Sequence, residues 1–414
     1  APAGWAALSE RYGRLPFAEL FSAAIGYAEH GFAVSPITAA AWQRAAAGPL
    51  KDQPDFVREF TRDGQAPAAG ETVKLPGHAS TLKLIAQSAA RDFYEGSLAE
   101  AMDAHARAGG GWLRAADLAA HEADWVGTIS TEFHGTELHE IPPNGQGLAA
   151  LIALGILRHF DLAALEPDSA AAFHLQLEAM KLALADAYRF IADPAHMDVT
   201  VRQLLEPGYL KARAALIDTE RAQDFQHGDP PQGGTVYLTT ADQDGMMVSL
   251  IQSNYMGFGS GIVVPGTGIS LQNRGAGFSL EAGHPNRVGP GKRPFHTIIP
   301  GFLTRGGQPD MSFGVMGGPM QAQGHVQMVL RTQVWGQNPQ AASDAPRWQV
   351  MKGLEVNVEA GVSEAVQAEL SRLGHEVSVQ EAGHFGGAQL ISRIGAGQYL
   401  AASDHRKDGH AGGF

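Results

Sequence analysis

One threonine is placed where it could become a nucleophile. Thr235 follows Gly233 and Gly234 in "QGGTVYLTTADQDG" (232–245), and a short alternating stretch comes after it. A hydroxyl is a weak nucleophile unless a base accepts its proton, and a threonine at a chain N-terminus carries such a base in its own α-amine, with a reference pKa of about 8. The stretch therefore suggests an N-terminal nucleophile, and a turn followed by a strand is the plainer alternative.

Thr235 could reach that state only if the bond after Gly234 is cut. Attack of its hydroxyl on the Gly234 carbonyl, an N→O acyl shift and hydrolysis of the resulting ester would cut the chain there. Glycine has no side chain to block the attack and tolerates unusual backbone angles. The polar stretch "DFQHGDPPQGG" (224–234) predicts a loop or linker that lets the cut end move away. We therefore expect cleavage between Gly234 and Thr235.

The elements that must position this threonine fall into two compositional halves. The first half is rich in alanine, and its apolar spacing predicts helices at 15–31, 80–96, 98–110, 145–160 and 170–194. A hairpin is expected at 127–143, with its turn at Gly135. The second half predicts strands at 235–241, 246–253 and 260–264, a strand–helix–strand unit at 354–380, and a closing hairpin formed by "AQLISRI" and "YLAAS". Composition alone indicates an α+β protein with a helical portion at 1–234 and a mixed portion at 235–414.

Composition also excludes several classes of protein. The net charge of −13 argues against a nucleic-acid partner, and the absence of cysteine excludes disulfides and thiolate metal sites. No run of eighteen apolar residues is present, so we expect a soluble protein without a membrane partner, either cytoplasmic or periplasmic. The N-terminus lacks a signal peptide and an initiator methionine, so we expect the true start of the protein to be missing.

Ordered blocks along nearly the whole chain resemble the γ-glutamyltransferase family of N-terminal-nucleophile hydrolases. The blocks that carry the resemblance include "PPNGQGLAALIALGIL", "FGSGIVVPGTGISLQNRGAGFS", "GKRPFHTIIP", "GVMGGPMQ" and "SDHRKDG". The resemblance implies an α+β fold, a four-layer α-β-β-α sandwich with two stacked, largely antiparallel sheets. It further implies an enzyme without metal or organic cofactor, whose α and β halves stay together as a heterodimer after cleavage and which acts on a small molecule.

The same resemblance assigns catalytic roles to four residues. Thr235 falls on the nucleophile created by cleavage, and Ser253 falls on a hydroxyl that hydrogen-bonds it. Gly317 and Gly318 fall on the pair whose backbone N–H groups form the oxyanion hole. Glycine suits that role because it permits close backbone approach, and such donors stabilise the transition state by about 3 kcal/mol each. A tight turn is the alternative interpretation of "MGG".

The expected substrate pocket departs from the family. Arg274 and Gly277 stand where γ-glutamyl enzymes carry acceptors for the substrate α-ammonium, and His296 and Thr297 replace a serine pair. Tyr255 stands where relatives have an asparagine that contacts the glutamyl group. The arginine that clamps the α-carboxylate in the family falls before residue 1. Such a pocket should repel a free amine and attract an anion, unless Arg274 faces solvent or pairs with an acid such as Glu281.

Three hypotheses for function follow. The first is a γ-glutamyl or glutathione hydrolase with an altered pocket. The second is an amidohydrolase of a small anionic amide, as in a branch similar to oxamate amidohydrolase, or an acylase. The third is an uncut, non-catalytic paralogue that only binds its ligand.

Other motifs carry weaker signals. The 17 histidines form no HExxH motif, and His134 and His139 are expected at the surface of the hairpin. "GFGSG" around Ser260 has the wrong spacing for a serine elbow. "NGQG" (144–147) is expected to begin a helix and is not a dinucleotide motif. Asp404, Arg406 and Asp408 are expected to form a structural charge network near the C-terminus.

Overall fold

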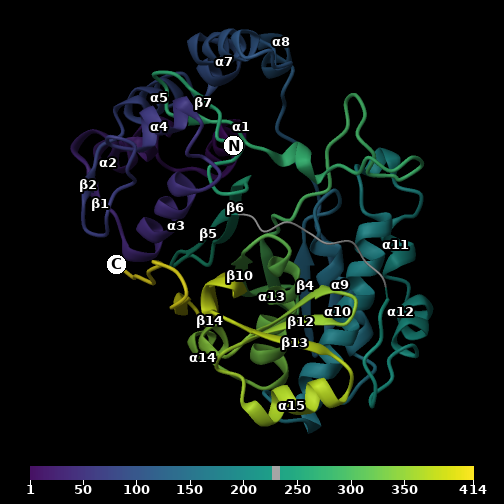
Figure 1. Ribbon diagram of the computed structural model, residues 1–414. Coiled ribbons are helices and arrows are strands. Elements are labelled where there is room, and N and C mark those ends of the chain that lie inside the picture. Colours follow the sequence, from purple (N-terminus) through teal and green to yellow (C-terminus); the bar gives the residue numbers. More distant parts are fainter. Residues whose placement is uncertain (226–233) are drawn as a thin grey trace. The chain divides into compact units, whose positions relative to one another are not determined.

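The computed structural model describes residues 1–225 and 234–414 (Figure 1). Most of the linker expected at 224–234, including Gly233, therefore lies outside the described residues. The chain forms two compact units, Ala1–Trp125 with Met256–Asn273, and Val126–Tyr255 with Arg274–Phe414. The expected division at 234/235 follows the predicted cut instead, and each compact unit contains residues from both sides of that position.

The first unit is helical. Its helices are α1 (Pro2–Tyr12), α2 (Ser22–His30), α3 (Pro36–Ala47), α4 (Pro54–Phe60), α5 (Pro76–Gln87), α6 (Arg91–Glu95), α7 (Ser97–Ala108) and α8 (Ala115–Ala119). Two short strand pairs accompany them, β1 (Phe32–Ala33) with β2 (Thr72–Val73), and β7 (Val263–Val264) with β8 (Ile269–Ser270).

Two expectations for this unit were wrong in detail. The helix expected at 80–96 is broken between α5 and α6, because Ala89 and Ala90 take positive φ values of 50° and 69° that end a helical turn. The strand expected at 260–264 is reduced to β7. Gly259 and Gly261 have φ values of 71° and 75°, which a strand does not accommodate.

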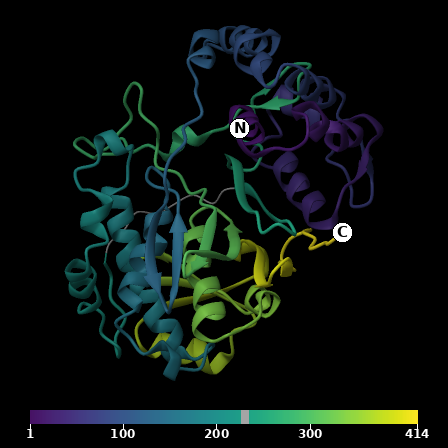
Figure 2. The ribbon, with the colours of Figure 1, turned by 180° about the vertical axis from the view of Figure 1, so that it is seen from behind.

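A six-stranded antiparallel sheet forms the centre of the second unit. Its order is β15 (Gln398–Ser403), β14 (Gly387–Gly395), β10 (Gln308–Met316), β9 (Gly301–Arg305), β4 (Thr136–Glu140) and β3 (Ile129–Phe133). The β3–β4 hairpin turns at His134 and Gly135, as expected, and the closing hairpin is β14–β15. Figure 2 shows β3 and β4 beside the strands that come from the second half of the chain.

Helices cover one face of this sheet. Helices α9 (Gly147–Leu157) and α13 (Met320–Val329) pack on its strands, and α14 (Pro339–Asp344) packs on β14 and β15. Helix α10 (Ala170–Phe190) packs on α9, and the remaining helices of this unit are α11 (Val201–Leu204), α12 (Pro207–Ala214) and α15 (Glu364–Arg372). Every residue of α9 is buried, as its uniformly apolar sequence requires. The helices expected at 145–160 and 170–194 are thus confirmed.

A hairpin of β5 (Gly234–Ala241) and β6 (Met247–Tyr255) packs on the opposite face. Side chains of β10 alternate, so Phe313 contacts His325 of α13 while Gly314 faces the ring of Tyr237 on β5. The Ser249 hydroxyl of β6 donates to the Phe313 carbonyl at 3.3 Å. Helices, sheet and hairpin are three successive layers within this unit, and the hairpin carries Thr235.

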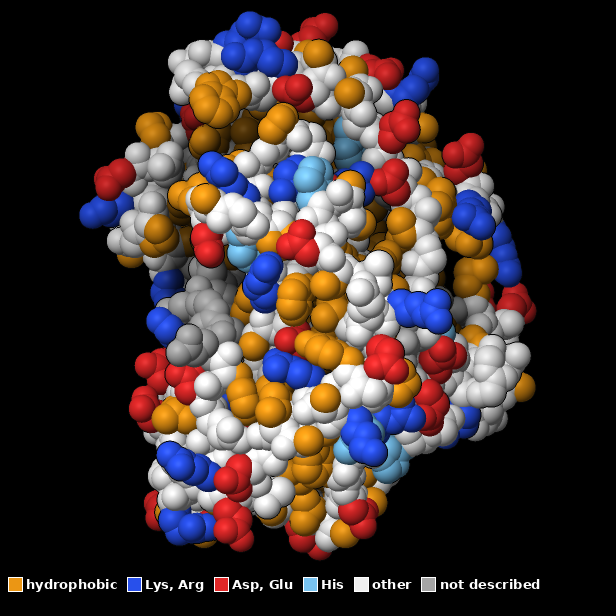
Figure 3. Space-filling view, turned by 90° about the vertical axis from the view of Figure 1, so that its right-hand side faces the viewer, with side chains coloured by type: hydrophobic (Ala, Val, Ile, Leu, Met, Phe, Trp, Pro, Cys, Tyr) orange, Lys and Arg blue, Asp and Glu red, His pale blue; other side chains and the backbone are white. Residues whose placement is uncertain are grey.

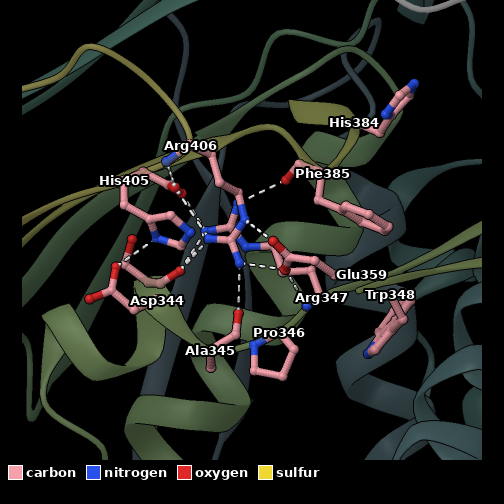
Figure 4. A network of polar contacts seen from close by, with 12 residues as sticks. Asp344, Ala345, Pro346, Arg347, Trp348, Glu359, His384, Phe385, His405 and Arg406 are labelled. Carbon is pink, nitrogen blue, oxygen red and sulfur yellow. Dashed lines mark hydrogen bonds and ion pairs between the residues drawn. The ribbon is translucent and has the colours of Figure 1, made fainter. Parts of the chain in front are cut away.

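A second buried region surrounds the charge network near the C-terminus (Figure 4). Arg406 contacts Glu359 on β12 (Glu355–Glu359), and Arg347 donates to Asp404 at 2.6 Å, with all four side chains buried. Burial alone would raise the pKa of Asp404, but the two arginines and backbone N–H groups outweigh it and lower that pKa. The expected network is confirmed for Asp404 and Arg406, whereas Asp408 is exposed.

Strand β12 belongs to a third sheet with β11 (Trp348–Lys352) and β13 (Glu376–Gln380). Helix α15 connects β12 to β13, which pair in parallel, so the strand–helix–strand unit expected at 354–380 is confirmed.

Acidic and basic side chains are interspersed over the face shown in Figure 3. Among the described residues, no helix combines the length and the apolar character that crossing a membrane requires.

The sheet predicts how a cut chain behaves. Strand β4 pairs with β9, so the pieces 1–234 and 235–414 share one sheet and one interior. We expect both pieces to elute together in size-exclusion chromatography under native conditions and to separate only in denaturant. Separation of the two pieces without denaturant would contradict this sheet pairing.

Candidate active site

Thr235 lies at a bulge in the β5–β6 hairpin. Gly234 pairs with Tyr255 and Val236 pairs with Gln252, so Thr235 alone stands opposite two residues of β6. Bulges redirect side chains and are common beside active sites. Here the bulge brings the Thr235 hydroxyl to 3.2 Å from the Ser253 hydroxyl, to which it donates. The two predicted catalytic hydroxyls are therefore in contact.

Ser253 is itself oriented by the chain that follows it. Its hydroxyl oxygen accepts the N–H of Tyr255 at 2.8 Å. Tyr255 has a φ of 79°, which is rare for an aromatic residue and costs about 1–3 kcal/mol. Backbone strain of this kind persists where the surrounding structure requires one conformation. Here the strained residue is the last of β6, and its N–H contacts the Ser253 hydroxyl.

Gly317 and Gly318 lie between the end of β10 and the start of α13. The hairpin lies over β10 with Tyr237 above Gly314, and the hydroxyls of Thr239 and Ser312 are in contact. Two residues further along, the same offset places Thr235 above the end of β10, where Gly317 begins. From this offset we expect the predicted oxyanion glycines to lie beside the predicted nucleophile.

The backbone at these glycines directs the Gly318 N–H away from α13. The Gly317 carbonyl accepts the N–H of Met320 at 3.2 Å, so it points into the helix. In a trans peptide the N–H points opposite to the carbonyl, so the Gly318 N–H points outward. The first N–H groups of a helix have no partner within the helix and lie at its positive end. This arrangement suits an oxyanion.

Glycine is required at this turn for two reasons. The first is that Gly317 and Gly318 have positive φ values of 133° and 62°, which residues with a side chain rarely adopt. The second is that a Cβ on Gly317 would come within 2.9 Å of the Gly386 Cα atom, so a side chain has no room there.

The four predicted substrate-binding residues line one cavity of about 350 Å³. They are Tyr255, Arg274, His296 and Thr297. The rest of the lining is Tyr188, Ile191, Ala276, Gly277, Phe278, Ser279, His284, Asn286 and Phe295, and none of these described residues is acidic. The cavity therefore presents no carboxylate to bind an ammonium group.

Arg274 is held against an aromatic ring instead of facing solvent. Its guanidinium carbon lies 4.4 Å from the centre of the Tyr255 ring, and one of its nitrogens donates to the Thr297 hydroxyl at 3.4 Å. Burial lowers the pKa of Arg274, and Tyr255 partly opposes that shift. An arginine remains charged under these conditions, so a cation faces the cavity.

His296 adds no second charge. Burial, with a smaller contribution from the charge of Arg274, lowers its pKa to about 3. The ring is therefore neutral near pH 7.

Gly277 also lines the cavity, and a Cβ there would lie 2.5 Å from the Phe295 carbonyl oxygen. An aspartate at 277, the acceptor seen in γ-glutamyl enzymes, would not fit without a backbone shift.

A buried cluster on α10 has the composition of a metal site but is occupied by an ammonium group. Ligand atoms of His174, Glu178 and His375 lie within 4.8 Å of one another. Lys181 donates to Glu178 at 2.8 Å and lies 3.3 Å from the His375 ring nitrogen, and the two histidine rings are hydrogen-bonded at 2.8 Å. Because the lysine supplies the positive charge, these residues form a closed hydrogen-bond network.

The residues of the weaker sequence motifs, His134, His139 and Ser260, do not line the predicted substrate cavity. His134 is exposed on the β3–β4 turn, and His139 contacts the Thr304 hydroxyl at 2.9 Å. Ser260 lies in the helical unit, where its hydroxyl donates to the Leu271 carbonyl. The "NGQG" stretch begins α9 as expected, but sequence analysis missed that Gln146 contacts Gly318. In the sequence, the flanking Gly145 and Gly147 were the signal that could have indicated a close approach of this backbone to other elements.

Comparisons with known proteins agree with this geometry. The chain matches the family described as Gamma-glutamyltranspeptidase over residues 1–414. It is 34% identical to the glutathione hydrolase-like YwrD proenzyme of Bacillus subtilis, covering 99% of this chain and 79% of that protein. It is 36% identical to the oxamate amidohydrolase proenzyme of Klebsiella pneumoniae, covering 97% and 76%.

The chain belongs to the gamma-glutamyltranspeptidase family. A solved structure titled cephalosporin acylase from Bacillus halodurans superposes with a TM-score of 0.94 at 45% identity, covering 99% of this chain and 76% of that one. The expected α+β sandwich of N-terminal-nucleophile hydrolases is thereby confirmed, and so is an enzyme of the hydrolase and acylase class. The proenzyme names of these family members indicate autocatalytic processing in the family.

The contact between the two hydroxyls predicts the effect of removing one of them. Ser253→Ala should lower kcat by about ten- to a hundredfold, the range of a lost orienting or proton-relay contact. Ser253→Thr retains a hydroxyl and should keep most of the activity. Steady-state kinetics on processed enzyme measure both variants, and unchanged kinetics in Ser253→Ala would show that the 3.2 Å contact has no role in turnover.

Proposed function

We propose that this family member hydrolyses amides of short acyl groups that carry an anion, through an acyl-enzyme on Thr235. The observation that carries the proposal is the Arg274 guanidinium over Tyr255, in a cavity without acidic lining residues. Tyr255 pairs with Gly234 in the hairpin, so the cavity begins beside the residue that precedes the nucleophile.

The proposed reaction uses groups of the chain alone. After cleavage, the Thr235 hydroxyl attacks the substrate carbonyl and its proton passes to the Thr235 α-amine. The oxyanion is held by the N–H groups of Gly317 and Gly318. The C–N bond then breaks, the amine leaves with the proton, and the acyl group remains as an ester on Thr235. Water attacks that ester with the α-amine as base and releases the acid, so no step requires a metal or cofactor.

Charge in the cavity favours an anionic acyl group over a γ-glutamyl group. A γ-glutamyl group carries an α-ammonium, which would meet the Arg274 cation and find no carboxylate in the described lining. A carboxylate at the same position gains a charge-assisted hydrogen bond in a partly dry site. Relatives named oxamate amidohydrolase and cephalosporin acylase support this choice, whereas glutathione hydrolase-like relatives support the γ-glutamyl alternative.

The nucleophile generates a prediction about processing. Thr235→Ala removes the hydroxyl that attacks Gly234, so this variant should remain a single chain. Thr235→Ser keeps a hydroxyl and should still be cut. Mass spectrometry of purified protein after long incubation decides the outcome. A wild-type chain that never yields an N-terminal Thr235 would instead support an uncut binding protein.

The cation generates a prediction about substrate charge. Arg274→Gln should lower kcat/KM about ten- to a hundredfold on oxamate or a glutaryl anilide, because a hydrogen bond to a charged group contributes about 1.5–3 kcal/mol. The same change should have little effect on a neutral acyl anilide of similar size.

Arg372→Gln, which removes an exposed arginine from α15, is the matched control and should leave both substrates unaffected. Efficient hydrolysis of glutathione by the wild type, unchanged in Arg274→Gln, would overturn the proposed preference for an anion.

A further inference from the structure

The "NGQG" turn before α9 joins two parts of the candidate active site through one side chain. The Gln146 side chain is fully buried, and its Nε2 donates to the Thr297 carbonyl at 2.8 Å and to the Gly318 carbonyl at 2.9 Å. Thr297 lines the acyl cavity and Gly318 belongs to the proposed oxyanion hole. A single amide group therefore connects the wall of the cavity to the oxyanion turn.

The backbone of the same turn also holds the cavity wall. The Gln146 N–H donates to the His296 carbonyl at 2.9 Å, and the His296 N–H donates to the Asn144 carbonyl at 3.1 Å. The Asn144 side chain donates to the Pro294 carbonyl. Gly145 and His296 thus form an isolated parallel bridge, and the Gln146 side chain extends from it to Gly318.

The neighbouring residues explain why a glutamine flanked by glycines stands here. A Cβ on Gly145 would lie 2.9 Å from the His296 ring, and a Cβ on Gly147 would lie 2.8 Å from the Glu140 side chain. A side chain at either position would therefore clash with these neighbours. The two acceptors that meet Gln146 are carbonyl oxygens, so only the NH₂ end of its amide can face them.

The contact at Gly318 bears on the reaction because it holds the peptide that follows the proposed oxyanion donor. The Gly318 carbonyl accepts from Gln146 and also from the Gln321 N–H at 3.1 Å, so it is held from two directions. Gly318 has a positive φ of 62° and no side chain to restrict rotation about its backbone bonds. The Gly318 N–H belongs to the preceding peptide, whose Gly317 carbonyl accepts the Met320 N–H at 3.2 Å. Because the peptides on both sides of the Gly318 Cα atom are then held, Gly318 cannot rotate between them, and its N–H, the proposed oxyanion donor, keeps its direction.

We propose that Gln146 is a positioning residue that aligns the Gly318 N–H with the oxyanion formed during acylation of Thr235. This inference rests on the proposed function. Loss of the contact should weaken binding of the tetrahedral state and leave binding of the ground-state carboxylate, which depends on Arg274, unchanged. Removing one oxyanion donor outright costs about 10²–10³ in kcat, so a misaligned donor should cost less.

The test compares Gln146→Met and Gln146→Glu with the wild type, on enzyme whose N-terminal Thr235 has been quantified by mass spectrometry. The readouts are kcat and KM on a glutaryl anilide, and the inhibition constants of glutarate and of a boronic acid with a carboxylate-bearing chain of the same length. The boronic acid forms a tetrahedral adduct with the nucleophile and so mimics the transition state.

We expect kcat/KM and boronic-acid affinity to fall together by about ten- to a hundredfold in Gln146→Met, while glutarate affinity changes less than about twofold. Gln146→Glu, which has the same shape but places oxygen against two carbonyls, should lose at least as much. The matched control is Gln327→Met, which removes a buried glutamine of α13 that donates to the Trp348 carbonyl at 3.0 Å. It should lower the Tm without changing the kinetics.

Three outcomes would overturn the inference. They are equal weakening of glutarate and boronic acid, kinetics like those of Gln327→Met, and failure of the Gln146 variants to process while Gln327→Met processes normally. A wild-type enzyme that neither hydrolyses the anilide nor binds the boronic acid would refute the proposed function itself, and the wild-type measurement therefore separates the two.

Discussion

The pairing of β4 with β9 is the constraint on which the rest of the site depends. It joins strands from before and after Thr235 in one antiparallel sheet, and buried side chains from both parts, such as Leu151 and Phe313, form one hydrophobic cluster. A backbone cut in the hairpin above that sheet leaves the interior intact. The protein can therefore hold a strand whose first residues are free to become a terminus.

The turn at Gly317, the proposed oxyanion hole, is held in place by a buried charge network on the neighbouring segment. Gly317 is packed against the backbone of Gly386, and that segment is held on both sides, because Arg347 donates to the Phe385 carbonyl at 2.8 Å and Asp404 accepts the Ala388 N–H at 2.7 Å. Buried charges of this kind contribute little net stability when paired, but removing one partner costs about 3–5 kcal/mol. Their contribution here is a defined geometry, which an oxyanion hole needs more than it needs stability.

Burial and charge together set the character of the cavity beside Tyr255. Burial keeps His296 neutral, so the positive charge near the nucleophile belongs to Arg274. The face of the Tyr255 ring attracts that cation. The same tyrosine takes an unfavourable backbone conformation that lets its ring reach Arg274 while its N–H orients Ser253.

Local patterns of residues were enough to predict the long helices and the hairpins, and motifs were enough to propose the reactive residues. Apolar periodicity predicted α9 and α10, and ordered motifs placed Thr235, Ser253 and the glycine pair. The tertiary structure alone decided where helices break, as at Ala89 and Ala90, and which distant groups meet, as Gln146 meets Gly318 across 172 positions. Periodicity reports the face that a residue buries, whereas a hydrogen bond between buried groups depends on how the elements pack. That packing is absent from any local stretch of sequence.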